Sequence, residues 1–343
     1  MTARNEIRHL AEAVDSVFDQ DYPGPLELVV AIGPSTDGTE ALAKQLAARH
    51  QGRVRVLHNP TGRTPAGLNI AIDATRSEST VIVRTDGHAN LPHDYVSTAV
   101  EVLQRTGAAN VGGMMIPEGT TPFELAVARA MSEKIGMGSA TFHVGGAEGP
   151  TDTVYLGVFD RAVLVKTGGF DEHFTRAQDW ELNHRIRELG ATVWFDPRLQ
   201  VSYRPRASAR ALATQFHGSG IWRWQIIRAY PETVSVRYLA APTATFAVGA
   251  AAAVLVVDAA LIHSGALAVA AAAVPAGYIA VIVAGAALTR RGLDARTSAL
   301  YPVALATMHM SWGFGFLRAA SGDALRAVRD RLMRRRAPSE SRR

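Results

Sequence analysis

Two side chains in the first third of the chain could bind a divalent metal ion. Asp86 and His88 lie in the stretch Thr85-Asp86-Gly87-His88, which ends the predicted buried strand Val81–Arg84. A carboxylate oxygen and an imidazole nitrogen can face the same side of such a short loop, and imidazole suits Mn²⁺ slightly better than Mg²⁺. A cation held there would neutralise a diphosphate and stabilise it as a leaving group. The alternatives are that Asp86 only caps the loop and that His88 only lines a site.

A second acidic residue is placed to act as a general base. Asp179 opens the stretch Asp179–Leu189, for which we predict a helix. The positive end of the helix dipole keeps a carboxylate ionised. An ionised carboxylate can take the proton of an attacking hydroxyl group. Asp179 could instead only cap its helix, and Glu181, in the same stretch, is the alternative base.

The elements that position these residues follow from the apolar pattern. Strands are predicted over Leu26–Ile32, Val54–Leu57, Val81–Arg84 and Ala109–Met115. Helices are predicted over Glu6–Phe18, Thr36–Arg49, Ala66–Thr75 and Pro92–Arg105. Such alternation implies a mostly parallel sheet covered on both faces, with ligands beyond the carboxyl ends of its strands. Ser35–Asp37 and Asp86–His88 both follow strand ends, so we expect them beside one crevice.

The start of the chain departs from this pattern. It opens on a predicted helix, whereas a sheet of this kind normally begins with a central strand. Either the strand order is unusual, or the first strand of the sheet lies upstream of Met1; we expect the second.

Composition excludes several classes of chemistry and partner. The chain of 343 residues has no cysteine, which excludes disulfides, thiolate nucleophiles, iron–sulfur clusters and cysteine zinc sites. The net charge of +5 arises in the tail Ser321–Arg343, which has eight Arg against three acidic residues. Because this excess is one terminal cluster and not a stripe across a folded face, we expect no nucleic-acid partner. A basic segment beside an apolar one favours anionic lipid headgroups.

The apolar part of the chain predicts membrane segments. Between Tyr238 and Thr289, Asp258 is the only residue charged at neutral pH. Two spans fit there, about 239–262 and 266–288, each long enough for a hydrocarbon core of about 30 Å. A weaker segment covers 297–317. The predicted organisation is a catalytic domain over 1–235, membrane segments over 236–320 and a basic tail over 321–343.

Charge also predicts the orientation. Arg290, Arg291 and Arg296 mark the loop after the second span as cytoplasmic, and the Arg-rich tail marks the C-terminus as cytoplasmic. Both ends of the weaker segment then lie on one side, so it should be re-entrant or interfacial. The polar start of the chain has no cleavable signal, so we expect a multi-pass protein of a bacterial cell membrane with its catalytic domain in the cytoplasm.

Several motifs in order resemble family 2 glycosyltransferases of the GT-A fold. They are Arg4-Asn5-Glu6, Ser35-Thr36-Asp37-Gly38-Thr39, Asn69, Asp86-Gly87-His88-Ala89, the run from Gln178 to Arg185, Tyr203-Arg204-Pro205-Arg206, Gln215 and Trp222-Arg223. The pattern is similar to the succinoglycan-type enzymes, which extend a polyprenyl-linked sugar and carry C-terminal membrane segments. Two positions depart from the family: Ile32 stands for an acidic residue that contacts uridine, and Gln178 stands for a Glu.

The resemblance implies roles for particular residues. Asp179 would be catalytic, and Asp86 with His88 would hold Mn²⁺ or Mg²⁺. The residues implied to bind the donor are Arg4, Asn5, Glu6, Ser35, Asp37, Asn69 and Asp86. The residues implied to bind the acceptor or a diphosphate are Arg204, Arg206, Gln215, Trp222 and Arg223; a generic aromatic and basic membrane belt is the alternative for this second set.

The resulting prediction is an inverting glycosyltransferase. It would move a hexose from a nucleotide-diphosphate sugar, with a UDP-sugar expected, to a lipid-linked or cell-envelope glycan, in contact with membrane lipids. A polyprenyl-phosphate sugar synthase, whose acceptor is the lipid phosphate, is the alternative of the same fold. A non-catalytic membrane scaffold with a degenerate GT-A fold is the alternative of another class, and Ile32, Gln178 and the absent strand favour it.

Overall fold

The computed structural model describes the backbone of residues 1–336 and the side chains of residues 1–326. It divides the chain into two compact units, of which the first comprises Met1–Thr120 and Met131–Pro205. The second begins with Thr121–Ala130 and continues from Arg206. The units thus divide at Pro205, whereas the predicted catalytic domain runs to residue 235. Residues 337–343 of the predicted basic tail lie outside the described residues.

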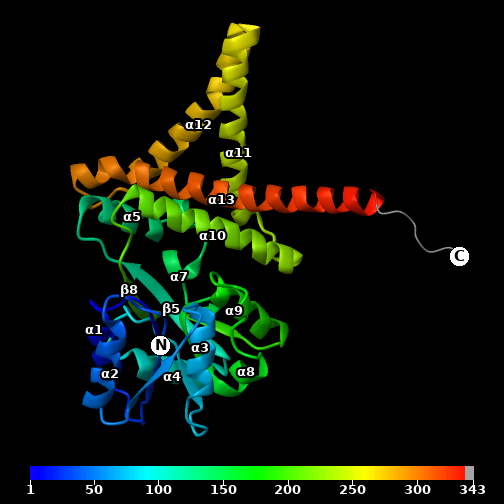
Figure 1. The fold of residues 1–343 in the computed structure, drawn as a ribbon. Helices are drawn as coiled ribbons and strands as arrows, with labels where there is room; N and C mark the ends of the chain where they lie inside the picture. The colour runs from blue at the N-terminus through cyan, green and yellow to red at the C-terminus, as the bar shows by residue number, and fades with distance from the viewer. Residues whose placement is uncertain (337–343) are drawn as a thin grey trace, which may run out of the picture. The chain divides into compact units, whose positions relative to one another are not determined.

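The first unit alternates strands and helices (Figure 1). Its strands are β1 (Thr2–Ala3), β2 (Leu28–Ile32), β3 (Val54–His58), β4 (Val81–Val83), β5 (Asn110–Pro117), β6 (Gly149–Pro150), β7 (Tyr155–Asp160) and β8 (Val193–Tyr203). Its helices are α1 (Leu10–Phe18), α2 (Thr39–Arg49), α3 (Thr64–Asp73), α4 (Tyr95–Thr106), α6 (Lys134–Met137), α7 (Thr141–Val144), α8 (Arg161–Lys166) and α9 (Gln178–Glu188). The predicted elements before residue 120 are therefore present, with ends shifted by a few residues.

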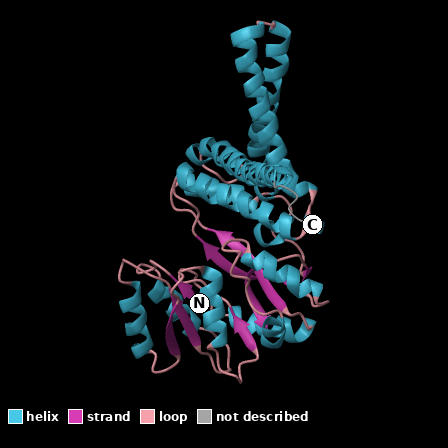
Figure 2. Ribbon diagram, turned by 45° about the vertical axis from the view of Figure 1, so that its right-hand side comes forward, coloured by secondary structure: helices cyan, strands magenta, loops and turns pink. Residues whose placement is uncertain are grey.

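The strands form two sheets, seen as magenta arrows in Figure 2. One has the order β1-β2-β3 and is parallel throughout. The other has the order β4-β7-β5-β8-β6, and only the β5–β8 pair in it is parallel. The prediction of a mostly parallel sheet is thus right for the first sheet and wrong for the second. The reason is β7, which runs antiparallel to β4 and β5 and lies between them.

The expected opening on a helix is wrong. Thr2–Ala3 form β1, which pairs in parallel with Ala31 and Ile32 of β2. Helix α1 begins only at Leu10. Two strand residues are too few to produce a readable alternation or apolar run. As a consequence, Arg4–Glu6 form a loop after a strand end instead of the first turn of a helix.

Apolar side chains bury both faces of the sheets. All five residues of β2 are buried, as expected for a parallel strand covered on both sides. On one face, α1, α2 and α4 pack around Leu10, Val30 and Tyr95, and the Tyr95 hydroxyl donates to the Leu156 carbonyl at 2.8 Å. On the other face, α3, α8 and α9 pack around Leu68 and Ile186. This layering fixes the strand ends at which the motif residues lie.

The second unit is helical. It contains most of α5 (Pro122–Ser132), then α10 (Ala209–Ala229), η1 (Pro231–Thr233), α11 (Val236–Val257), η2 (Asp258–Ile262), α12 (Gly265–Thr289) and α13 (Ala295–Arg336). Val236–Ile262 and Gly265–Thr289 are long and apolar enough to cross a membrane, by length and composition. They correspond to the two predicted spans and form a hairpin.

The weaker predicted segment 297–317 lies within α13. In both Figure 1 and Figure 2, α13 runs beside α10 and transverse to the α11–α12 hairpin. Glycines permit the close approach of α10 and α13, because a side chain at Gly220 would meet the Trp312 backbone and one at Gly315 the His217 backbone. Trp224 of α10 also donates to Asp323 of α13 at 2.9 Å. The segment therefore pairs with α10 and does not run alongside α11 and α12 as a third span.

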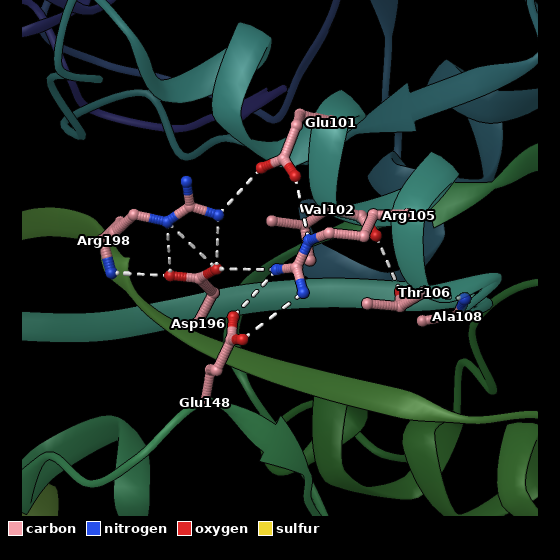
Figure 3. A network of polar contacts seen from close by, with 8 residues as sticks. All are labelled: Glu101, Val102, Arg105, Thr106, Ala108, Glu148, Asp196 and Arg198. Carbon is pink, nitrogen blue, oxygen red and sulfur yellow. Dashed lines mark hydrogen bonds and ion pairs between the residues drawn. The ribbon is translucent and has the colours of Figure 1, made fainter.

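An ion-pair network ties β8 to α4 in the first unit (Figure 3). Its centre is Asp196, which is 1% exposed and accepts from Arg198 at 2.8 Å. Arg198 also pairs with Glu101 at 2.8 Å, and Arg105 pairs with Glu148 at 2.8 Å. Burial alone would raise the pKa of Asp196, but the hydrogen bonds from Arg198 outweigh it and lower the pKa. The Arg198 hydrogen bond likewise lowers the pKa of Glu101.

We expect Asp196→Asn to destabilise the protein by about 1.5–3 kcal/mol at neutral pH, the usual range for hydrogen bonds to charged groups. Because the folded-state pKa of Asp196 is lowered, its contribution is present above the ordinary pKa of about 4 and is lost as the pH falls through the folded value. Thermal unfolding of both proteins at pH 7 and pH 3 measures this. The exposed Glu40, paired with Lys44 at 2.7 Å, provides the control Glu40→Gln, which should change stability little. Equal melting temperatures of wild type and Asp196→Asn at pH 7 would contradict the expectation.

Candidate active site

Hydrogen bonds join the loops that follow β1 and β2. The Asn5 amide donates to the Ser35 hydroxyl at 3.1 Å, and the Thr36 amide donates to the Asn5 side chain at 2.9 Å. The Glu6 amide donates to the Thr39 hydroxyl at 2.7 Å. Asn5 has a left-handed backbone (φ 57°), which asparagine tolerates better than most residues. The loops therefore form one polar ridge at the carboxyl ends of both strands.

Asp37 and Arg4 shape the same ridge. Asp37 accepts from the Ile7 amide at 3.1 Å and from the Thr39 hydroxyl at 2.6 Å, through different carboxylate oxygens. The Thr39 hydrogen bond is the main cause that holds the pKa of Asp37 below its usual range. Arg4 donates to the Pro34 carbonyl at 3.2 Å. Since these side chains already have partners within the loops, we expect them to act on a donor chiefly by fixing loop shape.

The loop after β4 is held against β1. The Gly87 amide donates to the Thr2 carbonyl at 3.1 Å, and a side chain at Gly87 would lie 2.9 Å from Ala3 Cβ. His88 Nδ1 lies 2.9 Å from Glu6 Oε1. Glycine is thus required at the middle position of Asp86-Gly87-His88. The structure brings the Asp86–His88 and Arg4–Glu6 loops together. The strand-end argument placed Asp86–His88 beside Ser35–Asp37 and did not include Arg4–Glu6, because β1 was not recognised.

Arg84 connects this loop to α9. Its guanidinium contacts Asp179 Oδ1 through one terminal nitrogen and Asp86 Oδ1 through the other, the latter at 3.2 Å. The Arg84 side chain is 7% exposed, against 20% for Asp86 and 32% for Asp179. Burial alone would lower the pKa of Arg84, but Asp179 and Asp86 outweigh it and raise the pKa. A buried cation therefore holds two partly exposed carboxylates.

Asp179 is not the cap of its helix. Helix α9 begins at Gln178, its N-cap position is Ala177 with a left-handed backbone (φ 59°), and no side chain caps it. Asp179 contacts Arg84 instead. The capping alternative is thus excluded by the observed contacts.

The alternative base Glu181 is contradicted by its surroundings. Glu181 is fully buried, and its two oxygens accept from Arg185 at 2.6 and 2.7 Å. Arg185 in turn donates to the Gly169 carbonyl at 2.8 Å. A fully buried carboxylate paired in this way cannot reach an acceptor hydroxyl group, so Glu181 stabilises the packing of α9.

Asn69, which the resemblance implies to bind the donor, has hydrogen-bond partners within the protein. Its side-chain amide donates to the Phe170 carbonyl at 2.8 Å and accepts from the Phe170 amide at 2.8 Å. A side chain at Gly169 would collide with it. Asn69 therefore ties α3 to the loop before α9.

The residues implied to bind acceptor or diphosphate are divided between the units. Arg204 is exposed in the first unit, whereas the other four belong to the second. Arg206 donates to Gln215 at 2.9 Å, and the Arg223 guanidinium lies 3.9 Å from the centre of the Tyr238 ring. Trp222 is half-buried in α10. The second unit thus pairs Arg206 with Gln215 and places Arg223 on an aromatic face.

The side chains available to bind a metal ion, Asp86 and His88, suit an ion that arrives together with a nucleotide. Among residues 1–326 there is no cluster of three or more His, Asp or Glu side chains that could hold an ion alone. Asp86 and His88 supply at most two ligands, so diphosphate oxygens and water must supply the others. Mg²⁺-type sites are commonly built from one or two carboxylates plus substrate phosphates.

Sequence reasoning missed Arg84. In the sequence pattern it is only the last residue of the predicted buried strand Val81–Arg84. A basic side chain at the end of a buried strand is rarely without a carboxylate partner, and that rule was the available signal. The identity of the two partners could not be read, because Asp179 lies 95 residues further along the chain.

The comparisons with known proteins agree with these motifs. Residues 1–168 match the model of glycosyl transferase family 2. The resemblance drawn from the motifs is confirmed, and β1 to α8 form the family 2 region of this chain.

Two relatives extend the similarity beyond the family 2 region. The succinoglycan biosynthesis protein ExoA of Rhizobium meliloti is 30% identical over 216 residues, which are 63% of this chain and 65% of that protein. A Methanococcus voltae protein named dolichyl N-acetyl-alpha-D-glucosaminyl phosphate 3-beta-D-2,3-diacetamido-2,3-dideoxy-beta-D-glucuronosyltransferase is 24% identical over 65% of this chain and 71% of its own. The chain thus spans a little under two thirds of the length of the Rhizobium protein.

A solved structure supports the fold. A mannosyltransferase from Pyrobaculum calidifontis, in complex with GDP-Man and Mn²⁺, aligns with a TM-score of 0.60 and 21% identity over 93% of this chain and 85% of that one. The family 2 region therefore belongs to a mixed α/β, GT-A-like fold.

Proposed function

We propose that this chain is a membrane-anchored inverting glycosyltransferase. It moves a hexose from a nucleotide-diphosphate sugar to a lipid-linked or cell-envelope glycan. The observation that carries the proposal is the contact of Arg84 with both Asp86 and Asp179, which joins the proposed metal ligand to the proposed base. The name of the Rhizobium relative, a succinoglycan biosynthesis protein, supports a glycan acceptor.

Asp179 acts as the general base in this proposal. It takes the proton from an acceptor hydroxyl while that oxygen bonds to the anomeric carbon of the donor, on the face opposite the leaving nucleoside diphosphate. The polar ridge after β1 and β2 binds the nucleotide side of the donor. Asp86 and His88 hold a divalent cation, which supplies positive charge to the diphosphate when bound.

A panel of radiolabelled donors tests this function. The purified full chain is incubated with Mn²⁺, a bacterial lipid extract and UDP-glucose, UDP-galactose or GDP-mannose, and labelled lipid is analysed. Label in an oligosaccharide-lipid supports the proposal. Label joined directly to a lipid phosphate indicates a polyprenyl-phosphate sugar synthase. If no donor gives either transfer or hydrolysis, the chain is a non-catalytic scaffold.

We also expect the first unit and the C-terminus to lie on the same, cytoplasmic, side of the membrane. The eight Arg of Ser321–Arg343 oppose transfer of that tail across the bilayer. Helices α11 and α12 are long and apolar enough to span a membrane, and in this proposal their hairpin crosses twice and returns the chain to the side from which it came. Alkaline phosphatase fused after Arg343 should be inactive in cells, and green fluorescent protein fused there should fluoresce. A control phosphatase fusion at His263, between the two spans, should be active; the reverse pair of results would overturn this topology.

A further inference from the structure

Arg84 makes a two-sided contact that the proposed chemistry does not itself require. Its terminal nitrogens reach carboxylates from two elements, the loop after β4 and the first turn of α9. Its backbone amide donates to the Gly157 carbonyl of β7 at 3.1 Å. Arg84 directly follows β4, and this hydrogen bond fixes its backbone against β7.

The third nitrogen of the Arg84 guanidinium, Nε, is buried and has no hydrogen-bond partner among the described residues. The guanidinium thus leaves one donor unsatisfied while it keeps both carboxylate contacts. An unsatisfied buried donor costs free energy, and the two charge-assisted contacts with Asp86 and Asp179 offset that cost.

The charges explain what those contacts do. Asp86 and Asp179 are like charges that approach a common cation, so without Arg84 they would repel each other. A guanidinium is planar and presents donors in a fixed fork, whereas a lysine ammonium is a point charge on a flexible stem. The fork therefore sets the spacing of the two carboxylates as well as neutralising part of their charge.

We propose that Arg84 is a positioning residue that fixes the distance between the donor-side carboxylate, Asp86, and the acceptor-side carboxylate, Asp179. This inference rests on the proposed function, because it assigns the two carboxylates to the two substrates. Arg84 itself contacts neither substrate. Its loss displaces the base from the anomeric carbon, and a displacement of about 1 Å can lower the rate about 100-fold.

The test compares Arg84→Lys, which keeps the charge without the fork, with Arg84→Met, which removes the charge. For both we expect a kcat lower by about 100-fold and a donor KM within about threefold of wild type, measured with the donor that the wild type uses. A purely structural role would instead reduce the amount of folded protein and leave the kcat of the folded fraction unchanged. Wild-type kcat in Arg84→Lys would overturn the proposal.

A second measurement does not depend on turnover. Binding of Mn²⁺ alone, followed by electron paramagnetic resonance, should be at least about fivefold tighter in Arg84→Met, because the guanidinium no longer competes for the carboxylates. Arg49→Met is the control, since Arg49 is 63% exposed and pairs only weakly with Asp15 at 3.5 Å. If the wild type uses no donor, the proposed function fails, and Mn²⁺ affinity alone decides on Arg84: tighter binding supports its contacts with the carboxylates, and unchanged binding overturns them.

Discussion

Asp179→Asn should lower kcat by about 100- to 10,000-fold, the range typical for removal of a general base. The base takes the acceptor proton only as the new bond forms, so its loss affects the transition state more than donor binding. Asparagine keeps the shape of the side chain and can still accept a hydrogen bond from Arg84. The variant should therefore fold, remain in the membrane and bind nucleotide with nearly wild-type affinity. Initial rates and nucleotide titration on the same preparation measure both properties.

Glu181→Gln provides the comparison for Asp179. Because Glu181 is fully buried and paired with Arg185, its loss should lower the melting temperature and leave the kcat of the folded protein within a few fold of wild type. A near wild-type rate for Asp179→Asn would refute the assignment of the base. The lipid-phosphate acceptor would then gain support, since a phosphate nucleophile arrives already deprotonated.

Asp86→Asn should reduce transfer by about 1,000-fold or more, because Lewis-acid stabilisation by a metal ion is worth several kcal/mol in the transition state. The variant keeps the size of the side chain, and asparagine binds divalent cations more weakly than a carboxylate does. His88→Ala should have a smaller effect, since one ligand and the diphosphate would remain. Rates measured across a Mn²⁺ titration test this, and the concentration needed for half-maximal rate should rise in both variants.

The control for Asp86 is Asp94→Asn. Asp94 is an exposed acidic residue at the start of α4 whose side chain does not cap the helix. Its replacement should leave the metal response unchanged. Full activity of Asp86→Asn in the presence of a chelator would show that Asp86 binds no required metal.

The local pattern of the chain was sufficient for many of its elements and for proposing two carboxylates as site residues. Strand β2 is a continuous buried apolar run, which can be recognised without tertiary information because it is encoded by adjacent residues. The two long apolar helices are equally local, since a span is defined by length and composition. Asp86 and Asp179 could be chosen because their motifs are contiguous in sequence.

Contacts between segments that lie far apart in the sequence could not be predicted. The two-residue β1 has no pattern of its own and exists only because β2 offers a parallel edge. The second sheet is mostly antiparallel because β7 lies between β4 and β5, which no local run encodes. The residue types of Asp37 and Asn69 suit a donor site, but their hydrogen bonds to Thr39 and Phe170 depend on how the chain folds back.

What the sequence by itself determined is the kind of chemistry: carboxylates and an imidazole at strand ends, next to an apolar hairpin and a basic tail. The tertiary structure decided which of those groups meet. It buried Glu181 against Arg185 and left Asp179 partly exposed, although the two are neighbours in α9. It also brought Arg84, which directly follows β4, between Asp86 and Asp179, because a buried cation is stable only where folding supplies carboxylates to pair with it.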